Sequence, residues 1–531
     1  MRTTSLCVLL VAFFLSACER SNFERQSAPP AASSTPGKPL GPEDGEERPV
    51  ATSNEAVLAP SGTSPNSRPS ESTQSSTESN APAEALDAWA AKGKGHARVA
   101  LFDLERGAWL VESRADEFEN PASTQKILTA AATLDLLGPA HTFKTEIFGS
   151  VERGRASRLT IRGGGAPDLS TSDLWRLSRV LVEGGLSEVG AIFVDQSRFD
   201  ENSVPPAFEQ QPDEWAAFRA PVSALSLDRN TIELNVLPQA EGQPARSWFQ
   251  PPGASSVRGR VQTGPPAAGD KVTWSLTATP GGAPLVSELG GTIASDLGRT
   301  KYARRLDDPR LVPGFALREL LAAQGVKVGS EVRLGANDGA RRLVQLDSEP
   351  LGVLVRALGK ESDNFTAETL LIALSQLEVG APATTPWSTE RGLAVLRRWL
   401  GERGLGAEGV VLRNGSGLFD ANRLSPRVLA RTLRFMWNRP GSNAEFVGQL
   451  AMGGQDGTLR ARFAKGPLAG RVRAKTGTLR DVSALSGYVL RADGRAPLAF
   501  AVLLSGTAGR QDEARRRIDQ TLAALVALAG P

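Results

Sequence analysis

The chain has 531 residues, a length that fits two to four domains. Its 61 basic and 58 acidic residues nearly balance, so charge gives no support for a nucleic acid or an acidic polymer as partner. Hydrophobic residues make up 40% of the chain, which is enough for a sizeable core. Only two histidines are present, His96 and His141, and neither lies in a motif, so any nucleophilic site must find its base elsewhere.

Residues 1–17 have the pattern of an export signal. Arg2 gives a positive start, and the apolar stretch 6–15 is too short to remain as a membrane-spanning helix. The string LSAC at residues 15–18 resembles the lipobox of bacterial lipoproteins, which predicts cleavage before Cys18 and a lipid on that cysteine. An ordinary signal peptide with a cysteine near its end is the alternative. Glu19, where an aspartate would signal inner-membrane retention, favours the outer membrane.

Residues 18–82 are predicted to form a disordered tether behind the lipidated N-terminus. They are rich in Ser, Pro, Thr, Glu and Gly and almost lack large apolar residues, so they cannot bury enough surface to offset the entropy of ordering. The other cysteine, Cys7, would leave with the signal peptide. The mature domain would then contain no disulfide and no thiolate metal site.

The first part of a core domain is expected over residues 83–149. A helix is predicted near residues 85–92, and two strands at 99–102 and 108–112 flank a turn that contains glycine. A further helix is expected from 123 to 137, because its apolar positions recur at helical spacing and Gly-Pro follows.

Residues 150–345 are predicted to form one or more inserted, β-rich domains. A helix-like stretch at 314–324 is expected at the junction back to the core. Glycine turns separate the short strand-like runs 158–162, 191–195, 231–237 and 271–278.

Residues 346–531 are expected to complete the core. Helices are predicted up to about residue 440, then strands, then a closing helix. Strands from both ends of the chain suggest an antiparallel sheet with helices on both faces, which is an α/β (α+β) fold. The predicted elements are helices at 364–376, 388–402 and 511–528 and strands at 471–475, 482–490 and 498–504.

Ser123 and Lys126 form an S-x-x-K string at the start of a predicted helix. Residues three apart point the same way, so the hydroxyl and the amine can meet. Ser123 is then a candidate nucleophile that forms an acyl-enzyme, and Lys126 is its candidate base. Lys126 must be neutral for part of the cycle, which burial and a nearby positive charge such as Lys475 would favour. The structural alternative is a helix-capping serine and a solvated lysine.

Ser362 and Asn364 form an S-x-N string. Ser362 could carry a proton to the leaving amine, and Asn364 could hold the substrate amide and position Lys126. The structural alternative is a loop serine and a helix-capping asparagine.

Lys475, Thr476 and Gly477 form a K-T-G string at a predicted strand end. Lys475, with the hydroxyls of Thr476 and Thr478, could bind a terminal carboxylate, and Gly477 would let a substrate backbone approach the strand edge. The backbone N–H groups of Ser123 and Thr478 would form an oxyanion hole. The alternative is an exposed lysine on an edge strand. In this order, however, the three strings form the known SxxK, SxN and KTG set of penicillin-acylated serine enzymes.

Over residues 85–530 the chain resembles the class C low-molecular-mass penicillin-binding proteins of the penicillin-binding protein 4 type, which are D-alanyl-D-alanine carboxypeptidases/endopeptidases. The resemblance includes the three motifs, APVSALS at 220–226, NGSGL at 414–418 and the long insertion. It implies a penicillin-binding-protein/β-lactamase-like transpeptidase core with large β-rich insertion domains. It also implies a serine D,D-peptidase that removes terminal D-alanine from peptidoglycan stem peptides or opens D-Ala cross-links, and that β-lactams inhibit.

The chain departs from the family pattern at two positions. Ala166, in the string GGGAPD at 163–168, and Asn414 each stand where the family usually has Asp. Family analogy leaves a homodimer open, and neither a metal nor an organic cofactor is expected. The signal and lipobox predict an exported, periplasmic protein anchored to a membrane through Cys18.

Two other functions compete with the peptidase. A β-lactamase would hydrolyse its acyl-enzyme fast, but no E-x-x-x-N string follows the second motif at the usual distance, and the large insertion is unusual for a lactamase. A non-catalytic, cell-wall-binding lipoprotein on a decayed peptidase fold is the other alternative. The intact motif residues argue against it.

Overall fold

The structure is a computed structural model that describes residues 80–530 except 203 and 280–283. The predicted signal peptide 1–17, Cys18 and nearly all of the tether lie outside the described residues. Within the described part, no helix is both long and apolar enough to cross a membrane.

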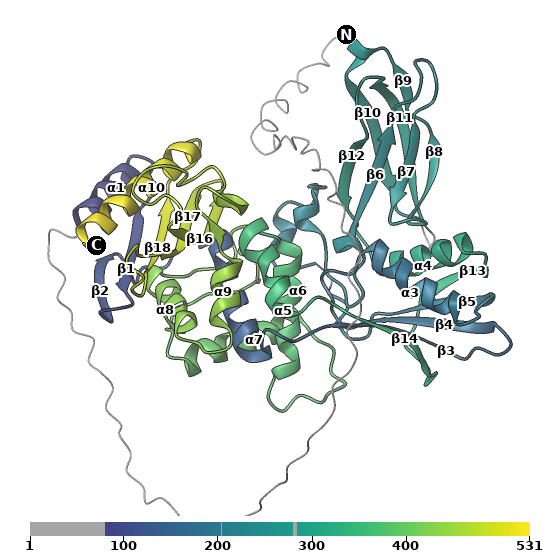
Figure 1. The fold of residues 1–531 in the computed structure, drawn as a ribbon, viewed down its shortest axis with the longest axis horizontal. Coiled ribbons are helices and arrows are strands. Elements are labelled where there is room, and N and C mark those ends of the chain that lie inside the picture. Colours follow the sequence, from purple (N-terminus) through teal and green to yellow (C-terminus); the bar gives the residue numbers. More distant parts are fainter. Residues whose placement is uncertain (1–79, 203, 280–283, 531) are drawn as a thin grey trace, which may run out of the picture. The chain divides into compact units, whose positions relative to one another are not determined.

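A six-stranded antiparallel sheet forms the core and joins the two ends of the described chain (Figure 1). Its order is β15-β16-β17-β18-β1-β2. β1 (Ala97–Asp103) pairs with β18 (Leu498–Ser505) over its full length. This confirms the predicted sheet built from both ends. The other strands are β2 (Ala108–Ser113), β15 (Ala451–Met452), β16 (Val472–Leu479) and β17 (Val482–Val489).

Helices cover both faces of this sheet. Successive side chains of a strand point to opposite faces, and β18 is apolar at every position that faces a helix layer. Its Phe500 and Val502 join a cluster with α1 (Ala81–Ala91) and α10 (Gln511–Leu528), whereas Leu503 joins the larger cluster on the opposite face.

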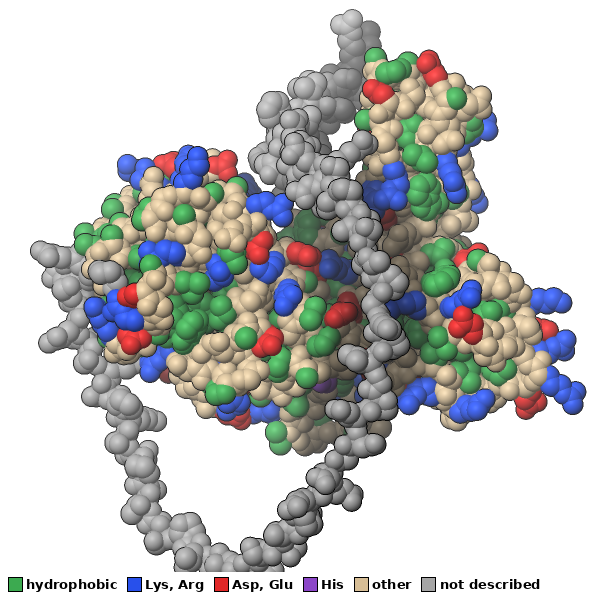
Figure 2. Space-filling model, in the orientation of Figure 1, with side chains coloured by type: hydrophobic (Ala, Val, Ile, Leu, Met, Phe, Trp, Pro, Cys, Tyr) green, Lys and Arg blue, Asp and Glu red, His purple; other side chains and the backbone are tan. Residues whose placement is uncertain are grey.

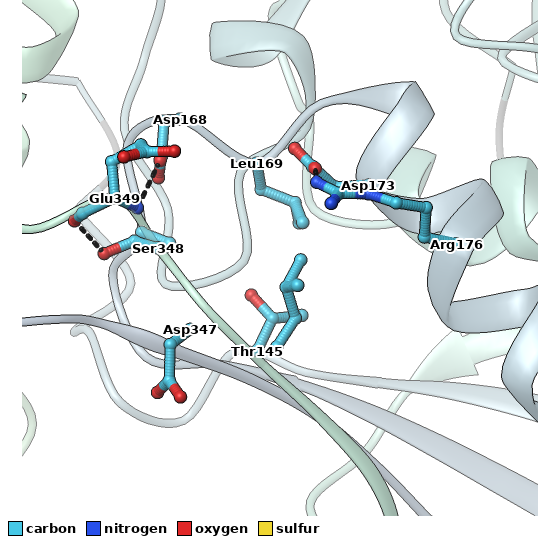
Figure 3. A pocket seen from close by; sticks show the side chains of 10 residues that line it. Thr145, Asp168, Leu169, Asp173, Arg176, Asp347, Ser348 and Glu349 are labelled. Carbon is cyan, nitrogen blue, oxygen red and sulfur yellow. Dashed lines mark hydrogen bonds and ion pairs between the residues drawn. The ribbon is translucent and has the colours of Figure 1, made fainter. Parts of the chain in front are cut away.

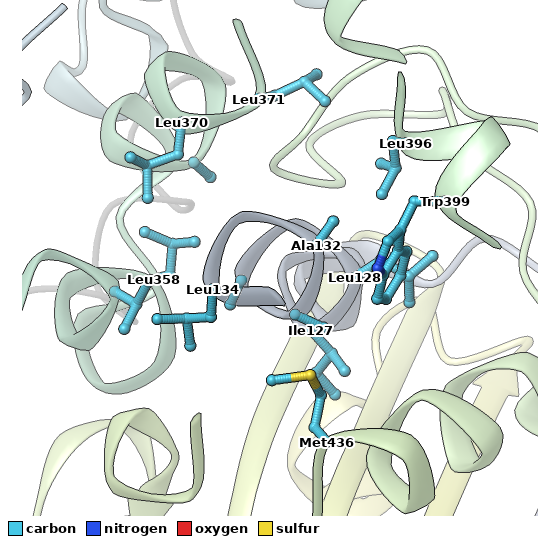
Figure 4. Packing of buried hydrophobic residues seen from close by; sticks show 14 of the residues in the cluster. Ile127, Leu128, Ala132, Leu134, Leu358, Leu370, Leu371, Leu396, Trp399 and Met436 are labelled. Atoms are coloured by element: carbon cyan, nitrogen blue, oxygen red, sulfur yellow. The ribbon is translucent and has the colours of Figure 1, made fainter. Parts of the chain in front are cut away.

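Helix α2 (Lys126–Leu137) runs through the larger cluster and is buried almost all round. Its buried residues include Lys126, Thr129 and Thr133 besides the apolar ones, so polar groups of this helix must find partners inside the protein. Figure 4 shows Leu128 and Ala132 of α2 among side chains of neighbouring helices, including Trp399 and Met436. The surrounding helices are α5 (Leu351–Arg356), α6 (Asn364–Ala373), α7 (Thr389–Glu402), α8 (Pro426–Trp437) and α9 (Asn443–Gln449).

A second, five-stranded mixed sheet has the order β13-β5-β4-β3-β14. Helices α3 (Thr171–Glu183) and α4 (Val312–Ala323) pack on it, and Ser170 with Asp173 forms a capping box at the start of α3. The helix expected at the junction to the core is α4, and that placement is wrong. Leu317 of α4 packs in the same cluster as Ile192 of β5, because the apolar face of α4 is buried against this sheet. The strands are β3 (Lys144–Gly149), β4 (Arg155–Gly163), β5 (Glu188–Asp195), β13 (Lys327–Leu334) and β14 (Arg342–Asp347).

Two small sheets lie between β5 and α4 in the sequence. One has the order β12-β6-β7, the other β10-β11-β8 with β9 beside β11. Ile232 and Leu234 of β6 share a hydrophobic cluster with Trp274 of β10 and Ile293 of β11. The strands are β6 (Thr231–Leu237), β7 (Arg246–Gln250), β8 (Ser255–Gly259), β9 (Gln262–Gly264), β10 (Asp270–Thr277), β11 (Leu285–Ala294) and β12 (Thr300–Arg305).

The predicted domain limits at residues 149 and 345 stay predictions. The five-stranded sheet reaches past both of them, since β3 begins at Lys144 and β14 ends at Asp347.

Candidate active site

Ser123 lies in a 3-10 turn, η2 (Ala122–Gln125), directly before α2, so the helix begins later than predicted. The turn is held in an unusual conformation: Ala122 has a φ of 46°, and its N–H donates to the side chain of Asn120 at 2.9 Å. Non-glycine residues in this region of φ cost energy and gather at functional sites. The Lys126 Nζ lies 3.0 Å from the Ser123 Oγ, as the spacing of the first motif predicts.

The second motif meets the first through Lys126. Asn364 begins α6, and its Oδ1 accepts a hydrogen bond of 2.7 Å from the Lys126 Nζ. Its Nδ2 donates to the Phe218 carbonyl of the inserted part at 3.0 Å. Asp363, not Asn364, is the helix cap, because its side chain accepts from the Thr366 N–H. Ser362 precedes this cap in a left-handed conformation, with φ 61°.

The third motif faces the second. The Lys475 Nζ donates to the Ser362 Oγ at 2.9 Å and to the Thr476 carbonyl at 2.8 Å. Lys475 is not at a strand end as predicted: β16 continues to Leu479, where a tight turn leads into β17. Within the described part of the chain, β15 pairs only with Arg473 and Ala474, so this edge of β16 is open from Lys475 onward.

The two threonines of this region differ in their surroundings. The Thr476 hydroxyl donates to the Thr458 hydroxyl at 2.9 Å, and Thr478 is exposed. The structure therefore brings five of the predicted residues into two contacting sets, one around Lys126 and one formed by Lys475 and Ser362, and places the threonines beside the second set. The five residues are Ser123, Lys126, Ser362, Asn364 and Lys475.

Two glycines permit the close packing around Ser123. A Cβ at Gly477 would lie 2.9 Å from the Pro121 carbonyl oxygen, so a side chain there would push β16 away from the turn. Gly417 has a φ of 75°, and a Cβ there would lie 1.9 Å from the Ala122 carbonyl oxygen. Any side chain at either position would displace the serine turn.

Both lysines are buried, with 1% of each side chain exposed. Burial lowers the pKa of Lys126 to about 7, although the charges of Glu368 and Asp363 act in the opposite direction. Burial, and then the neighbouring charge of Lys126, place the pKa of Lys475 well below its usual value. The two amines therefore disfavour each other's charged form.

Three residues around Lys126 were not predicted from the sequence. Ser416 accepts from the Lys126 Nζ through its carbonyl at 2.8 Å, and its N–H donates to Glu368 at 2.8 Å. Thr129 donates to the Gly415 carbonyl at 2.7 Å. The available signal was Glu368 itself, the one acidic residue in the otherwise mainly apolar helix NFTAETLLIA.

The two departures from the family pattern have different surroundings. Asn414 uses its amide as a donor to the carbonyls of Leu418 and Pro206, which an ionised aspartate could not do. Ala166 and Asp168 line a separate cavity of about 230 Å³ beside β3 and β14 (Figure 3). None of the motif residues is part of that lining.

A larger cavity, of about 560 Å³, borders the end of β16. Phe218, Leu418 and Leu479 supply apolar walls, and Asp420 and Arg480 supply charge. The carbonyl of Phe218 also accepts the bond from Asn364, so this cavity lies next to the second motif, although no motif residue lines it.

On the face that Figure 2 shows, basic and acidic side chains are mixed. Lys and Arg side chains lie scattered there among Asp and Glu. Among the described residues, no group of three or more His, Cys, Asp or Glu side chains is placed to hold a metal ion.

Comparison with known protein sequences shows the family to which this chain belongs. The profile of the D-Ala-D-Ala carboxypeptidase 3 (S13) family of peptidases matches residues 83–527. The chain belongs to this family. A D-alanyl-D-alanine carboxypeptidase from Actinomadura sp. (strain R39) is 30% identical over 430 residues, which span 77% of this chain and 78% of that protein. The D-alanyl-D-alanine carboxypeptidase DacB of Haemophilus influenzae is 23% identical over 76% of this chain and 84% of its own length.

A solved structure supports the fold of this S13 peptidase. The crystal structure of penicillin binding protein 4 (dacB) from Haemophilus influenzae superposes with a TM-score of 0.66. The match covers 80% of this chain and 93% of that one at 22% identity. The predicted family and the predicted mixed α/β fold are thereby confirmed.

Proposed function

We propose that this S13 peptidase is a serine D,D-peptidase of peptidoglycan stem peptides that works through an acyl-enzyme on Ser123. The observation that carries the proposal is the position of the Lys126 Nζ, 3.0 Å from the Ser123 Oγ and 2.7 Å from the Asn364 Oδ1. A buried amine within hydrogen-bond distance of a half-buried hydroxyl can take the proton of that hydroxyl, and the hydroxyl oxygen can then act as a nucleophile.

The chemistry proceeds in two steps. In the first, the Ser123 Oγ attacks the carbonyl of the penultimate D-alanine while its proton passes to the neutral Lys126 amine. The C–N bond then breaks, and the proton that Lys126 has taken up passes through the Ser362 hydroxyl, which accepts from Lys475, to the nitrogen of the leaving amine. In the second step Lys126 takes a proton from the water that attacks the Ser123 ester and gives it to the Ser123 Oγ as the ester C–O bond breaks and the shortened peptide leaves.

Substrate binding uses the open edge of β16. An extended peptide can add to this edge by backbone hydrogen bonds, with its terminal carboxylate near Lys475, Thr476 and Thr478. The backbone N–H groups of Ser123 and Thr478 would stabilise the tetrahedral oxyanion, a contribution of about 3 to 4 kcal/mol for each donor in acyl transfer. The close packing of Gly477 on Pro121 supports this arrangement, because it holds the strand against the serine turn.

Substrate binding would also prepare the base. A carboxylate beside Lys475 favours the charged form of that lysine, and a charged Lys475 disfavours the charged form of Lys126. The effect of the Lys126 charge on the pKa of Lys475 supports this coupling.

The rate of acylation is expected to rise with pH around a midpoint near 7. The pKa of Lys126 is about 7, and only the neutral amine, which prevails above that pH, can accept the serine proton. The second-order rate constant for labelling by a fluorescent penicillin, measured from about pH 5 to about pH 9, checks this. A rate that stayed flat through neutral pH would assign the base to another group.

Export and anchoring belong to the same proposal. Peptidoglycan lies outside the cytoplasm, and the lipobox-like string at 15–18 would place the enzyme on the periplasmic side of a membrane, held by a lipid on Cys18. The tether would let the catalytic part move away from the anchor. A homodimer stays a prediction, and sedimentation of the purified protein checks it.

Cys18→Ala is expected to abolish incorporation of a radiolabelled fatty acid and to release the protein from the membrane fraction, because the lipid has no other attachment site in the lipobox. Cys7→Ala is the matched control and should leave labelling unchanged. Equal labelling of the Cys18 variant and the wild type would contradict the anchor.

The function is tested with two substrates, a stem pentapeptide and a purified cross-linked muropeptide, with products identified by mass spectrometry. Release of D-alanine from the first indicates carboxypeptidase action, and opening of the second indicates endopeptidase action. Rapid, repeated hydrolysis of penicillin with neither product would indicate a β-lactamase instead. Binding to peptidoglycan with no product and no penicillin adduct would indicate the non-catalytic protein.

A further inference from the structure

Glu368 is the buried acidic residue closest to the catalytic motifs that has no part in the chemistry above. It lies on α6, one turn after Asn364, and its side chain is fully buried. Its two carboxylate oxygens each accept one backbone hydrogen bond, from the N–H of Gly415 at 2.9 Å and from the N–H of Ser416 at 2.8 Å. A fully buried carboxylate is costly unless it is bonded and compensated by charge, so its presence calls for a role.

Glu368 and Lys126 both bond to the backbone of Ser416, one at its N–H and the other at its carbonyl. The N–H of Ser416 donates to Glu368, and the carbonyl of Ser416 accepts from the Lys126 Nζ at 2.8 Å. The adjacent Gly415 is held in the same way, by Glu368 at its N–H and by the Thr129 hydroxyl at its carbonyl, 2.7 Å away. The turn at 415–417 is therefore fixed on both sides between α6 and α2.

The charges of the two side chains are complementary. Glu368 favours the charged form of Lys126, and Lys126 favours the charged form of Glu368. Asp363, at the cap of α6, acts on Lys126 in the same direction. The charge of Lys126 in turn lowers the pKa of Lys475 on β16. Burial raises the pKa of Glu368, and the two N–H donors and the charge of Lys126 act in the opposite direction by favouring its ionised form.

We propose that Glu368 is a positioning residue for Lys126: it holds the 415–417 turn against the Lys126 amine and supplies the buried negative charge that opposes the lysine. This inference rests on the proposed function, since it concerns Lys126 as the base. It adds that the proton affinity of the base is set by a residue that touches neither the substrate nor Ser123. Loss of the charge lowers the affinity of Lys126 for its proton.

Glu368→Gln in the full chain tests the proposal, with the pH dependence of acylation by a fluorescent penicillin as the readout. The amide keeps the size of the side chain and one acceptor but removes the charge. The midpoint of the acidic limb is expected to fall by about one pH unit, because the lysine loses an opposing charge. The plateau rate should fall as well, since one of the two backbone N–H groups loses its acceptor.

Thr129→Val is the matched control. It loosens the same turn by removing the bond to Gly415 but changes no charge. Its plateau rate should fall roughly three- to tenfold with the midpoint unmoved. A purely structural role for Glu368 predicts that the Gln variant behaves like this control, and that result would overturn the proposal.

Glu368→Asp serves if the Gln variant does not fold. The shorter side chain withdraws its charge from Lys126, so the midpoint should move down by less than in the Gln variant, and an unmoved midpoint would overturn the proposal. Failure of the proposed function looks different: the wild type would then show no acylation, or acylation that does not depend on Lys126. A wild type that is acylated through Lys126 beside a Gln variant with an unmoved midpoint rejects only the role of Glu368.

Discussion

Ser123→Ala is expected to lose all labelling by fluorescent penicillin and to lower kcat/KM for D-alanine release about 10⁴-fold or more. Among the described residues, the Ser123 hydroxyl is the side-chain nucleophile that Lys126 contacts, at 3.0 Å, so its loss removes the covalent step rather than weakening it. Gel fluorescence and D-alanine release measure the two effects. The fold should survive, because the side chain is half-buried and its hydroxyl bonds to Lys126, which keeps its other acceptors.

Ser256→Ala is the matched control for this prediction. Ser256 is exposed on β8, far from the motifs in sequence, and its hydroxyl makes a bond of 3.3 Å to the Leu285 carbonyl. Labelling and release should both equal those of the wild type. Labelling of the Ser123 variant at more than a hundredth of the wild-type rate would contradict the assignment of the nucleophile.

Lys126→Ala is expected to reduce the rate of acylation about 10²- to 10⁴-fold, the contribution of a general base. The variant also leaves the Asn364 Oδ1 and the Ser416 carbonyl without their donor and leaves Glu368 without its counter-charge. A lower melting temperature is therefore expected as well. Stopped-flow labelling and thermal unfolding, measured on the same sample, separate the two effects.

Lys126→Arg separates the effect of the positive charge from the effect of the base. Arginine keeps the positive charge beside Glu368 and can donate to the same acceptors, but it cannot deprotonate in this pH range and so cannot act as a base. Its melting temperature should exceed that of the alanine variant while its acylation rate stays as low. An arginine variant with more than a tenth of the wild-type rate would show that Lys126 positions groups rather than moves a proton.

The parts of the site that depend on local geometry could be predicted from the sequence. Ser123 and Lys126 are three residues apart at the start of a helix, so their contact follows from helical spacing. The contact between Lys475 and Ser362 joins residues separated by 113 positions, and no periodicity reveals it. The ordered motifs, which resemble a known family, predicted that both residues belong to one site but not that they contact each other.

The support around Lys126 could not be predicted, because it forms where three distant segments meet. Glu368, Ser416 and Thr129 come from α6, from the turn after α7 and from α2, and a sequence does not show which backbone amides a buried carboxylate will reach. The same limit applies to the inserted part. Its strand-like runs are strands, but α4 packs on the five-stranded sheet rather than at the junction, because its apolar face matches β5.

Mapping of a penicillin adduct tests the central claim most directly. The wild type is acylated with penicillin, digested, and the modified peptide is sequenced by tandem mass spectrometry. The adduct is expected on Ser123, in a single copy per chain, with none on the Ser123→Ala variant. An adduct on any other residue, or none on a protein that still releases D-alanine, would contradict a mechanism built on Ser123 and Lys126.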